Sequence, residues 1–170
     1  MKILSLLLVF VIAISCNAIS EEKNQAQTKS LQETLSGLWS LQAMEVTDSL
    51  GNWKQWRDGM GGYLLYGESG YMSLHLWEKG YEKTDLRFPN FTDTIPLEAL
   101  QHLTGSYVYI GDYSLNKEDS IVSHKRLSHS NPGDWGKTVQ RRFTFYGDTL
   151  VIRPVEEANA SLRLKWLKEE

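Results

Sequence analysis

Hydroxyl and imidazole side chains alternate with apolar ones along Tyr71–Trp77, and this pattern is one of the few in the sequence that could do chemistry. Successive side chains of a β-strand point to opposite faces, so Tyr71, Ser73 and His75 share one face and the intervening Met and Leu residues share the other. A few polar groups on an apolar wall are typical of small-molecule pockets. If the polar face points inward, these three residues are ligand-binding candidates; if it points to solvent, the Met and Leu residues form core.

Three tyrosines of a second stretch share a face in the same way. Tyr107, Tyr109 and Tyr113 have the same parity, and Gly111 interrupts them. The tyrosines could line a cavity in which the glycine leaves space for a ligand, or they could pack as a wall that fills the interior. Buried hydroxyl groups need hydrogen-bond partners in either arrangement. All three tyrosines are therefore candidates for ligand binding.

His124 and Arg142 lie on neighbouring predicted strands and complete the set of ligand-binding candidates. A buried guanidinium group needs an acceptor, because an unpaired charge is costly to remove from water. A carboxylate or phosphate of a ligand would serve, and so would Asp112 or Glu45 of the protein itself. We favour structural pairing of Arg142 and keep the ligand as the alternative.

Signatures of catalysis, metal binding and cofactor binding are missing from the sequence. It contains no G-x-S-x-G nucleophile elbow and no phosphate-binding glycine loop. The four histidines, His75, His102, His124 and His129, form no H-x-H or H-E-x-x-H pattern. We therefore expect neither a metal nor another cofactor. The enzyme chemistry that stays open is acid–base isomerisation or hydrolysis by His124, Arg142 and a tyrosine.

Composition and charge limit the class of protein. The chain has 170 residues, of which 41% are hydrophobic and 23% charged, and its formal net charge is -3. These values are those of an ordinary globular domain that can bury a core without disulfides. The weakly acidic balance provides no electrostatic footprint for nucleic acid or for a polybasic membrane patch, so we expect neither partner.

Cys16, the only cysteine, follows an N-terminal sequence typical of secretion. After a positive start, residues 3–14 form an almost unbroken apolar run that is too short to span a bilayer and has the proportions of a signal peptide. The sequence Ala13-Ile14-Ser15-Cys16 resembles the bacterial lipobox, although Ala13 stands where Leu or Val is usual. This resemblance implies that Cys16 carries a lipid. The alternative is an ordinary secretory signal that is cleaved near Ala18.

The sequence divides into a signal peptide at 1–15, a flexible tether at 16–35 and one domain at 36–170. The tether is rich in Ser, Glu, Lys, Gln and Thr, and it has too few large apolar residues to order itself by burial. Asn17 rather than Asp follows the cysteine, so the simplest inner-membrane retention signal is missing. We therefore expect a cell-envelope protein that is held by its lipid anchor alone, on the outer membrane.

The domain consists of short alternating segments between turn residues, which is typical of β-strands. Pro96–Leu103 is the one segment with helical spacing, and Thr94 precedes it as a plausible cap. Strands are predicted over residues 37–46, 53–56, 63–66, 71–77, 106–113, 120–127, 138–146, 149–154 and 161–167. About eight short strands with one short helix predict an all-β antiparallel barrel or sandwich, and only a barrel also removes exposed strand edges.

Several local motifs resemble the lipocalin-like domain family of bacteria and fungi. Gly37-x-Trp39 is similar to the lipocalin opening, in which the Trp closes one end of the barrel. The other motifs follow in family-like order up to Lys168; they are Gly61–Tyr66 with Ser69–Ser73, Tyr107–Tyr113, His124, Arg142–Leu150 and Leu164–Trp166. The resemblance implies a calycin-type, lipocalin-like β-barrel with Trp39 as its barrel-closing residue. It implies no particular activity, because most members of this family have none assigned.

These patterns lead to three hypotheses about function. The first is an envelope lipoprotein whose barrel binds a small, partly apolar molecule or lipid without catalysis. The second is the acid–base enzyme, which would act inside the barrel. The third is a structural or interaction protein with a packed barrel, in which exposed aromatic residues such as Trp53 and Trp56 contact a partner. The oligomeric state stays open.

Overall fold

The computed structural model describes residues 31–87, 94–156 and 161–170. The chain divides at Leu35, and the residues from Ser36 to Glu170 form one compact unit. Residues 31–35 are helical. Cys16, the predicted signal peptide and most of the predicted tether lie outside the described residues. In the described part of the chain, no helix is long and apolar enough to cross a membrane.

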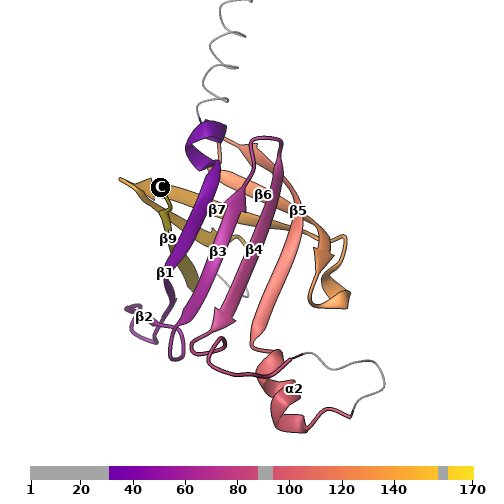
Figure 1. Cartoon of the computed structure of the whole chain (residues 1–170). Coiled ribbons are helices and arrows are strands. Elements are labelled where there is room, and N and C mark those ends of the chain that lie inside the picture. Colours follow the sequence, from indigo (N-terminus) through magenta and orange to yellow (C-terminus); the bar gives the residue numbers. More distant parts are fainter. Residues whose placement is uncertain (1–30, 88–93, 157–160) are drawn as a thin grey trace, which may run out of the picture. The chain divides into compact units, whose positions relative to one another are not determined.

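The compact unit is built on one antiparallel sheet that closes on itself (Figure 1). The order of the strands is β2-β1-β3-β4-β5-β6-β7-β8-β9, and β1 also pairs with β9, so eight strands form a barrel and β2 is added along β1. The strands are β1 (Gly37–Thr47), β2 (Trp53–Gln55), β3 (Met60–Tyr66), β4 (Tyr71–Glu78), β5 (Ser106–Asn116), β6 (Ile121–His129), β7 (Thr138–Tyr146), β8 (Thr149–Pro154) and β9 (Leu162–Lys168). The predicted all-β antiparallel barrel is confirmed.

Alternating burial explains why these segments close into a barrel. In β3, Gly62, Leu64 and Tyr66 are buried, whereas Tyr63 and Leu65 are exposed. The same alternation recurs in β4. Because each strand has one apolar face, closing the sheet buries these faces together. Closure also pairs β1 with β9, so that neither strand keeps a free edge there.

Large side chains fill one end of the barrel. Trp39 near the start of β1 is only 2% exposed, and its ring centroid lies 6.2 Å from that of Phe145. The Nζ atom of Lys168 lies 5.3 Å from the Trp39 ring. Other buried residues of this end are Tyr66, Tyr113, Val122, Phe143, Leu150 and Trp166. Trp39 is therefore one of the buried side chains that fill the closed end of the barrel.

The predicted helix is present as α2 (Leu97–Leu103), which connects β4 to β5. Figure 1 shows it beside the point where β5 begins, at the end of the barrel opposite Trp39. Pro96 is the N-cap residue, and no side chain forms a capping hydrogen bond. The prediction of Thr94 as the cap is wrong, because a capping residue must directly precede the first helical residue to reach the free N–H groups.

A bulge brings β5 and β6 unusually close together. Their register shifts between Ile110 and Gly111, and a Cβ atom at Gly111 would lie only 2.1 Å from the carbonyl oxygen of Lys125. A glycine at such a place permits the close approach of another backbone. The alternative in which Gly111 leaves space for a ligand is therefore wrong, since the backbone of β6 occupies that space.

Candidate functional site

A cavity of about 330 Å³ lies inside the barrel. Most of its wall is apolar and includes Leu64, Leu74, Ile152, Leu164 and Trp166. Polar groups come from five other lining residues, which are Tyr107, Tyr109, His124, Arg126 and Arg141. This combination of an apolar wall with a few polar groups is the usual composition of a small-molecule site.

The cavity opens toward the end of the barrel opposite Trp39. Met44 late in β1, Met60 at the start of β3 and Leu162 at the start of β9 line it and are half-buried. In an antiparallel barrel these positions belong to one end. The same end carries β2, α2 and the 3-10 helix η1 (Pro132–Asp134), which lies between β6 and β7. A ligand entering there would extend from the half-buried rim toward Trp166.

His124 of β6 lies between two tyrosines in the wall of the cavity. Its Nε2 atom is 2.8 Å from the hydroxyl oxygen of Tyr66, and its Nδ1 atom is 2.8 Å from that of Tyr109. A neutral imidazole has one N–H, so one tyrosine donates a hydrogen bond to His124 and the other accepts one. The three residues are buried and come from β3, β5 and β6. The network therefore joins three strands and occupies both ring nitrogens.

Burial keeps this network uncharged. Desolvation, reinforced by the positive charges of Arg141 and Arg126, lowers the pKa of His124 from 6.5 to about 3. Burial also raises the pKa of Tyr66 and of Tyr109 above the ordinary value for a phenol. At neutral pH the three side chains therefore provide hydrogen bonds without charge.

Arg126 brings a positive charge into the wall of the cavity. The residue is 5% exposed, and its Nη2 atom donates a hydrogen bond of 3.0 Å to the hydroxyl of Tyr107. Its Nη1 atom lies 3.5 Å from Oδ1 of Asp134, which is long for an ion pair. Among the described atoms, the buried Nε of Arg126 has no hydrogen-bond partner. The protein itself therefore satisfies the hydrogen-bonding groups of this guanidinium only in part.

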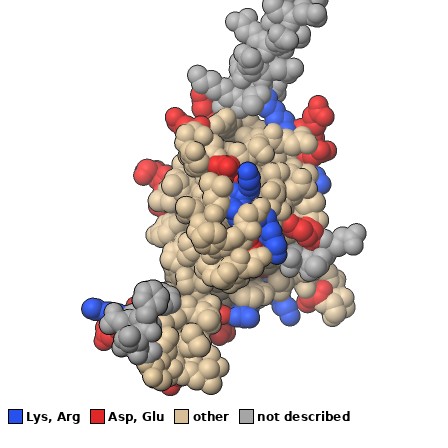
Figure 2. Space-filling view, turned by 90° about the vertical axis from the view of Figure 1, so that its right-hand side faces the viewer, with Lys and Arg blue, Asp and Glu red and all other residues tan. Residues whose placement is uncertain are grey.

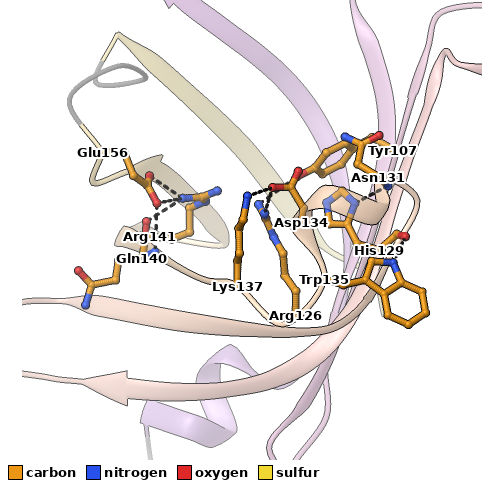
Figure 3. Close-up of polar contacts among 10 residues, drawn as sticks. All are labelled: Tyr107, Arg126, His129, Asn131, Asp134, Trp135, Lys137, Gln140, Arg141 and Glu156. Carbon is orange, nitrogen blue, oxygen red and sulfur yellow. Dashed lines mark hydrogen bonds and ion pairs between the residues drawn. The ribbon is translucent and has the colours of Figure 1, made fainter.

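Arg141 of β7 is the second cationic residue of the wall. Its Nη1 atom lies 2.8 and 3.1 Å from the two carboxylate oxygens of Glu156 and also donates to the carbonyl oxygen of Gln140. Figure 3 shows the two arginines with their acidic partners, Asp134 beside Arg126 and Glu156 beside Arg141. Both carboxylates belong to loops at the open end of the barrel, and their side chains are 32% and 42% exposed.

The three candidates on β4 lie on the outer face of the barrel. Tyr71 is 61% exposed, and His75 forms a hydrogen bond of 3.0 Å with the hydroxyl of Ser106. Ser73 is half-buried on the same face. The intervening residues are buried, and Leu74 lines the cavity. The inward placement of Tyr71, Ser73 and His75 is therefore wrong, because the strand turns its Met and Leu side chains inward.

Two of the three candidate tyrosines on β5 reach the cavity. Tyr107 and Tyr109 line it. Tyr113 points to the closed end, where its hydroxyl donates a hydrogen bond of 2.9 Å to the carbonyl oxygen of Gly67. The rings of Tyr113 and Tyr66 meet edge to face, with 4.9 Å between their centroids. The tyrosine face therefore serves partly as cavity wall and partly as core.

Arg142 is exposed on the outside of β7, where it donates a hydrogen bond of 2.9 Å to the carbonyl oxygen of Asp119. Glu45, one of its predicted acceptors, binds Arg163 instead. The buried placement of Arg142 is therefore wrong. Successive side chains of β7 point to opposite faces, and it is the neighbouring residue, Arg141, that faces the cavity.

Sequence reasoning missed Arg126 and Arg141. Both follow from strand parity, because Arg126 shares a face with His124 in β6, and Arg141 shares a face with the buried Phe143 in β7. The alternation of apolar residues in β7 therefore indicated that Arg141 faces the interior. Two consecutive arginines masked it, since either residue alone would have fitted a polar position.

The two tryptophans proposed to contact a partner are half-buried. The Arg163 guanidinium lies 4.0 Å from the ring centre of Trp53. Trp56 lines the cavity, and Arg57 lies 4.2 Å from its ring centre. Both rings therefore have contacts within the domain.

The described surface has no large field of one charge on the face drawn in Figure 2, where acidic and basic atoms are interspersed among other residues. Within the described ranges, no three His, Cys, Asp or Glu side chains are grouped as they would be around a metal ion. The charges that matter for the site are therefore those in and near the cavity.

Comparisons with known proteins identify the type of domain. The profile of a family described as a lipocalin-like domain matches residues 36–167. No curated protein matches the chain. One similar solved structure is described as a redesigned beta barrel; it has 12% sequence identity and a TM-score of 0.40, and the match covers 82% of this chain and 95% of that one.

Proposed function

Because the chain belongs to the lipocalin-like domain family, we propose that its barrel binds a small, largely apolar molecule without catalysis. The observation that carries this proposal is the mainly apolar cavity of about 330 Å³. A water molecule occupies about 30 Å³ in the liquid, and bonded atoms pack more closely than that, so the cavity has room for roughly ten to twenty non-hydrogen atoms. Such a volume is far larger than the voids of a packed interior, which supports a binder over a filled barrel.

The state of His124 supports binding over acid–base catalysis. A general base works best when its pKa lies near the working pH and its nitrogen can reach the substrate. The pKa of His124 is lowered to about 3, and both of its nitrogens already contact tyrosine hydroxyls. Arg142, which the enzyme hypothesis names beside His124 and a tyrosine, lies on the outside of the barrel. The polar groups of the wall are therefore better suited to orienting a ligand.

Replacing Leu74 by tryptophan is expected to weaken the binding of small apolar molecules strongly. Leu74 is 8% exposed and lines the cavity, so a larger ring at this position would occupy the volume that a ligand needs. Titration with the neutral fluorescent probe N-phenylnaphthylamine measures the effect. We expect saturable binding to the native domain and a loss of at least about tenfold in affinity for Leu74→Trp, or about 1.4 kcal/mol.

Leu65→Trp is the matched control, because Leu65 is 45% exposed on the outer face of the neighbouring strand. It makes the same chemical change and should bind the probe as the native domain does. Near-ultraviolet circular dichroism would show that both variants fold. A native domain that binds no apolar probe, or a folded Leu74→Trp variant that binds normally, would contradict a ligand in the cavity.

We also propose that the domain is carried by a lipoprotein of the cell envelope, on the outer membrane. The apolar run at 3–14 and the lipobox-like sequence that ends at Cys16 support this location. Replacing Cys16 by serine in the full chain should prevent incorporation of a labelled fatty acid and release the protein from membranes. Incorporation that persists in Cys16→Ser would contradict lipidation at this residue.

A further inference from the structure

We propose that the ligand is an apolar molecule with a single anionic group, and that Arg126 and Arg141 bind this group at the open end of the barrel. The proposal rests on the binding function proposed above and specifies its ligand class. It is carried by two arginines in the wall of an otherwise apolar cavity and by the position of the acidic groups that accompany them.

The cavity wall itself is cationic. Arg126 and Arg141 line it, and none of the described residues that line it is acidic. The carboxylates of Asp134 and Glu156 contact the arginines from the loops that border the open end. Among the residues that line the cavity, the charged groups that a bound molecule would contact are therefore guanidinium groups and not carboxylates. A cationic molecule would be repelled there, and an anionic one attracted.

Arg126 is the better prepared of the two for a new acceptor. Its side chain is only 7% exposed, so water compensates its charge poorly. Its protein partners are the Tyr107 hydroxyl at 3.0 Å and an Asp134 oxygen at 3.5 Å, and its Nε atom has no partner among the described atoms. A carboxylate can accept two parallel N–H bonds from one guanidinium group. The charge of the Arg126 guanidinium is thus incompletely compensated within the protein, which makes it the group that an incoming anion would approach.

Charge balance favours one negative charge on the ligand. Asp134 lies between two cations, since Lys137 Nζ is 3.2 Å from the same oxygen that Arg126 contacts. With Arg141 and Glu156, the group shown in Figure 3 contains three cationic and two acidic side chains. One further anion would neutralise it. A dianion would give the group a net negative charge, and a neutral ligand would leave its net charge positive.

The field of the two arginines reaches other parts of the wall. Their positive charges both contribute to the lowered pKa of His124, after desolvation, and both partly offset the burial that raises the pKa of Tyr107. The positive potential therefore extends across the polar side of the cavity. The apolar part of a ligand would lie against Leu74, Leu164 and Trp166, with its anionic group toward Arg126 and Arg141.

The test compares decanoic acid, decanol and decylamine as competitors of N-phenylnaphthylamine, each below the concentration at which it forms micelles. These molecules match the size of the cavity and differ in the charge of one end. At neutral pH we expect decanoate to bind at least about tenfold more tightly than decanol, and decylamine to bind most weakly. Equal affinities for the acid and the alcohol would overturn the anionic ligand and leave the proposed function intact. Failure of all three, with no probe binding, would instead overturn the proposed function.

Three arginine variants test which residues bind the anionic group of the ligand. Arg126→Met and Arg141→Met should reduce the preference for decanoate over decanol to less than about threefold while affinity for decanol is retained. Arg142→Met is the matched control, because Arg142 follows Arg141 on the outer face of β7 and should keep the native preference. If Arg126→Met fails to fold, Arg141→Met still decides the question. A preference that survives in the folded Arg141→Met variant, or one that is lost in Arg142→Met, would contradict the assignment.

Discussion

Replacing Gly111 by alanine is expected to lower the free energy of unfolding by at least about 3 kcal/mol, a cost at the upper end for overpacking. The added Cβ atom would lie 2.1 Å from the carbonyl oxygen of Lys125 and 3.2 Å from the Cα atom of Arg126. Both neighbours belong to the backbone of β6, so no side-chain rotation relieves the clash. Chemical denaturation followed by tryptophan fluorescence measures the loss.

The same substitution should also weaken ligand binding, because β6 carries His124 and Arg126 into the cavity. Gly133→Ala is the matched control, since a Cβ atom at Gly133 in η1 would meet no described atom within 4 Å. It should change the free energy of unfolding by less than about 0.5 kcal/mol. Equal stabilities of the Gly111→Ala and Gly133→Ala variants would show that β5 and β6 can separate without cost at the bulge.

Acidification from pH 7 to pH 5 is expected to lower the free energy of unfolding by about 2 kcal/mol through His124 alone, and by roughly 4 to 5 kcal/mol as the pH approaches 3. Burial lowers the pKa of this imidazole from 6.5 to about 3 in the folded protein. The unfolded chain therefore takes up a proton below pH 6.5 that the folded chain cannot bind. The stabilisation is complete above pH 6.5 and is lost progressively as the pH falls to 3.

The range between pH 7 and pH 5 separates this effect from that of the carboxylates. Ion pairing or hydrogen bonding lowers the pKa values of Glu45 and Asp134, so these groups are protonated only at lower pH. His129 acts in the same direction as His124, because burial and Arg126 lower its pKa too. In His124→Asn, the loss of stability between pH 7 and pH 5 should shrink by about 2 kcal/mol. A His124 ring that titrates near pH 6.5 by NMR would contradict the prediction.

The fold could be predicted because it depends on local patterns that repeat along the chain. Alternation within strands such as β3, and turn residues between them, indicate an antiparallel all-β domain without any knowledge of long-range contacts. The bulge at Gly111 could not be predicted in this way. It depends on how closely β6 approaches, and the sequence of β5 alone does not contain that distance.

The candidate site was predicted less completely, because the sequence divides each strand into two faces and does not say which of them points into the barrel. In β4 the sequence offers a polar face with His75 and an apolar face with Leu74, and only closure of the barrel decides which points inward. The same choice separates Arg141 from Arg142 in β7. His124, Tyr107 and Tyr109 line the cavity, and their binding of a ligand stays a prediction. A shift by one residue in either strand exchanges a cavity residue for a surface residue.

Closure of the sheet through β1 and β9 also limits one route by which copies of this protein could associate. A free strand edge is a template for pairing with another chain and hence for aggregation. In the described part of the domain, the strands of the barrel are paired on both sides, and β2 remains as an added strand of three residues beside β1. Lys54 is at the centre of β2, and charged residues and short length both oppose further pairing. Addition of strands from another copy of the domain is therefore opposed at this edge.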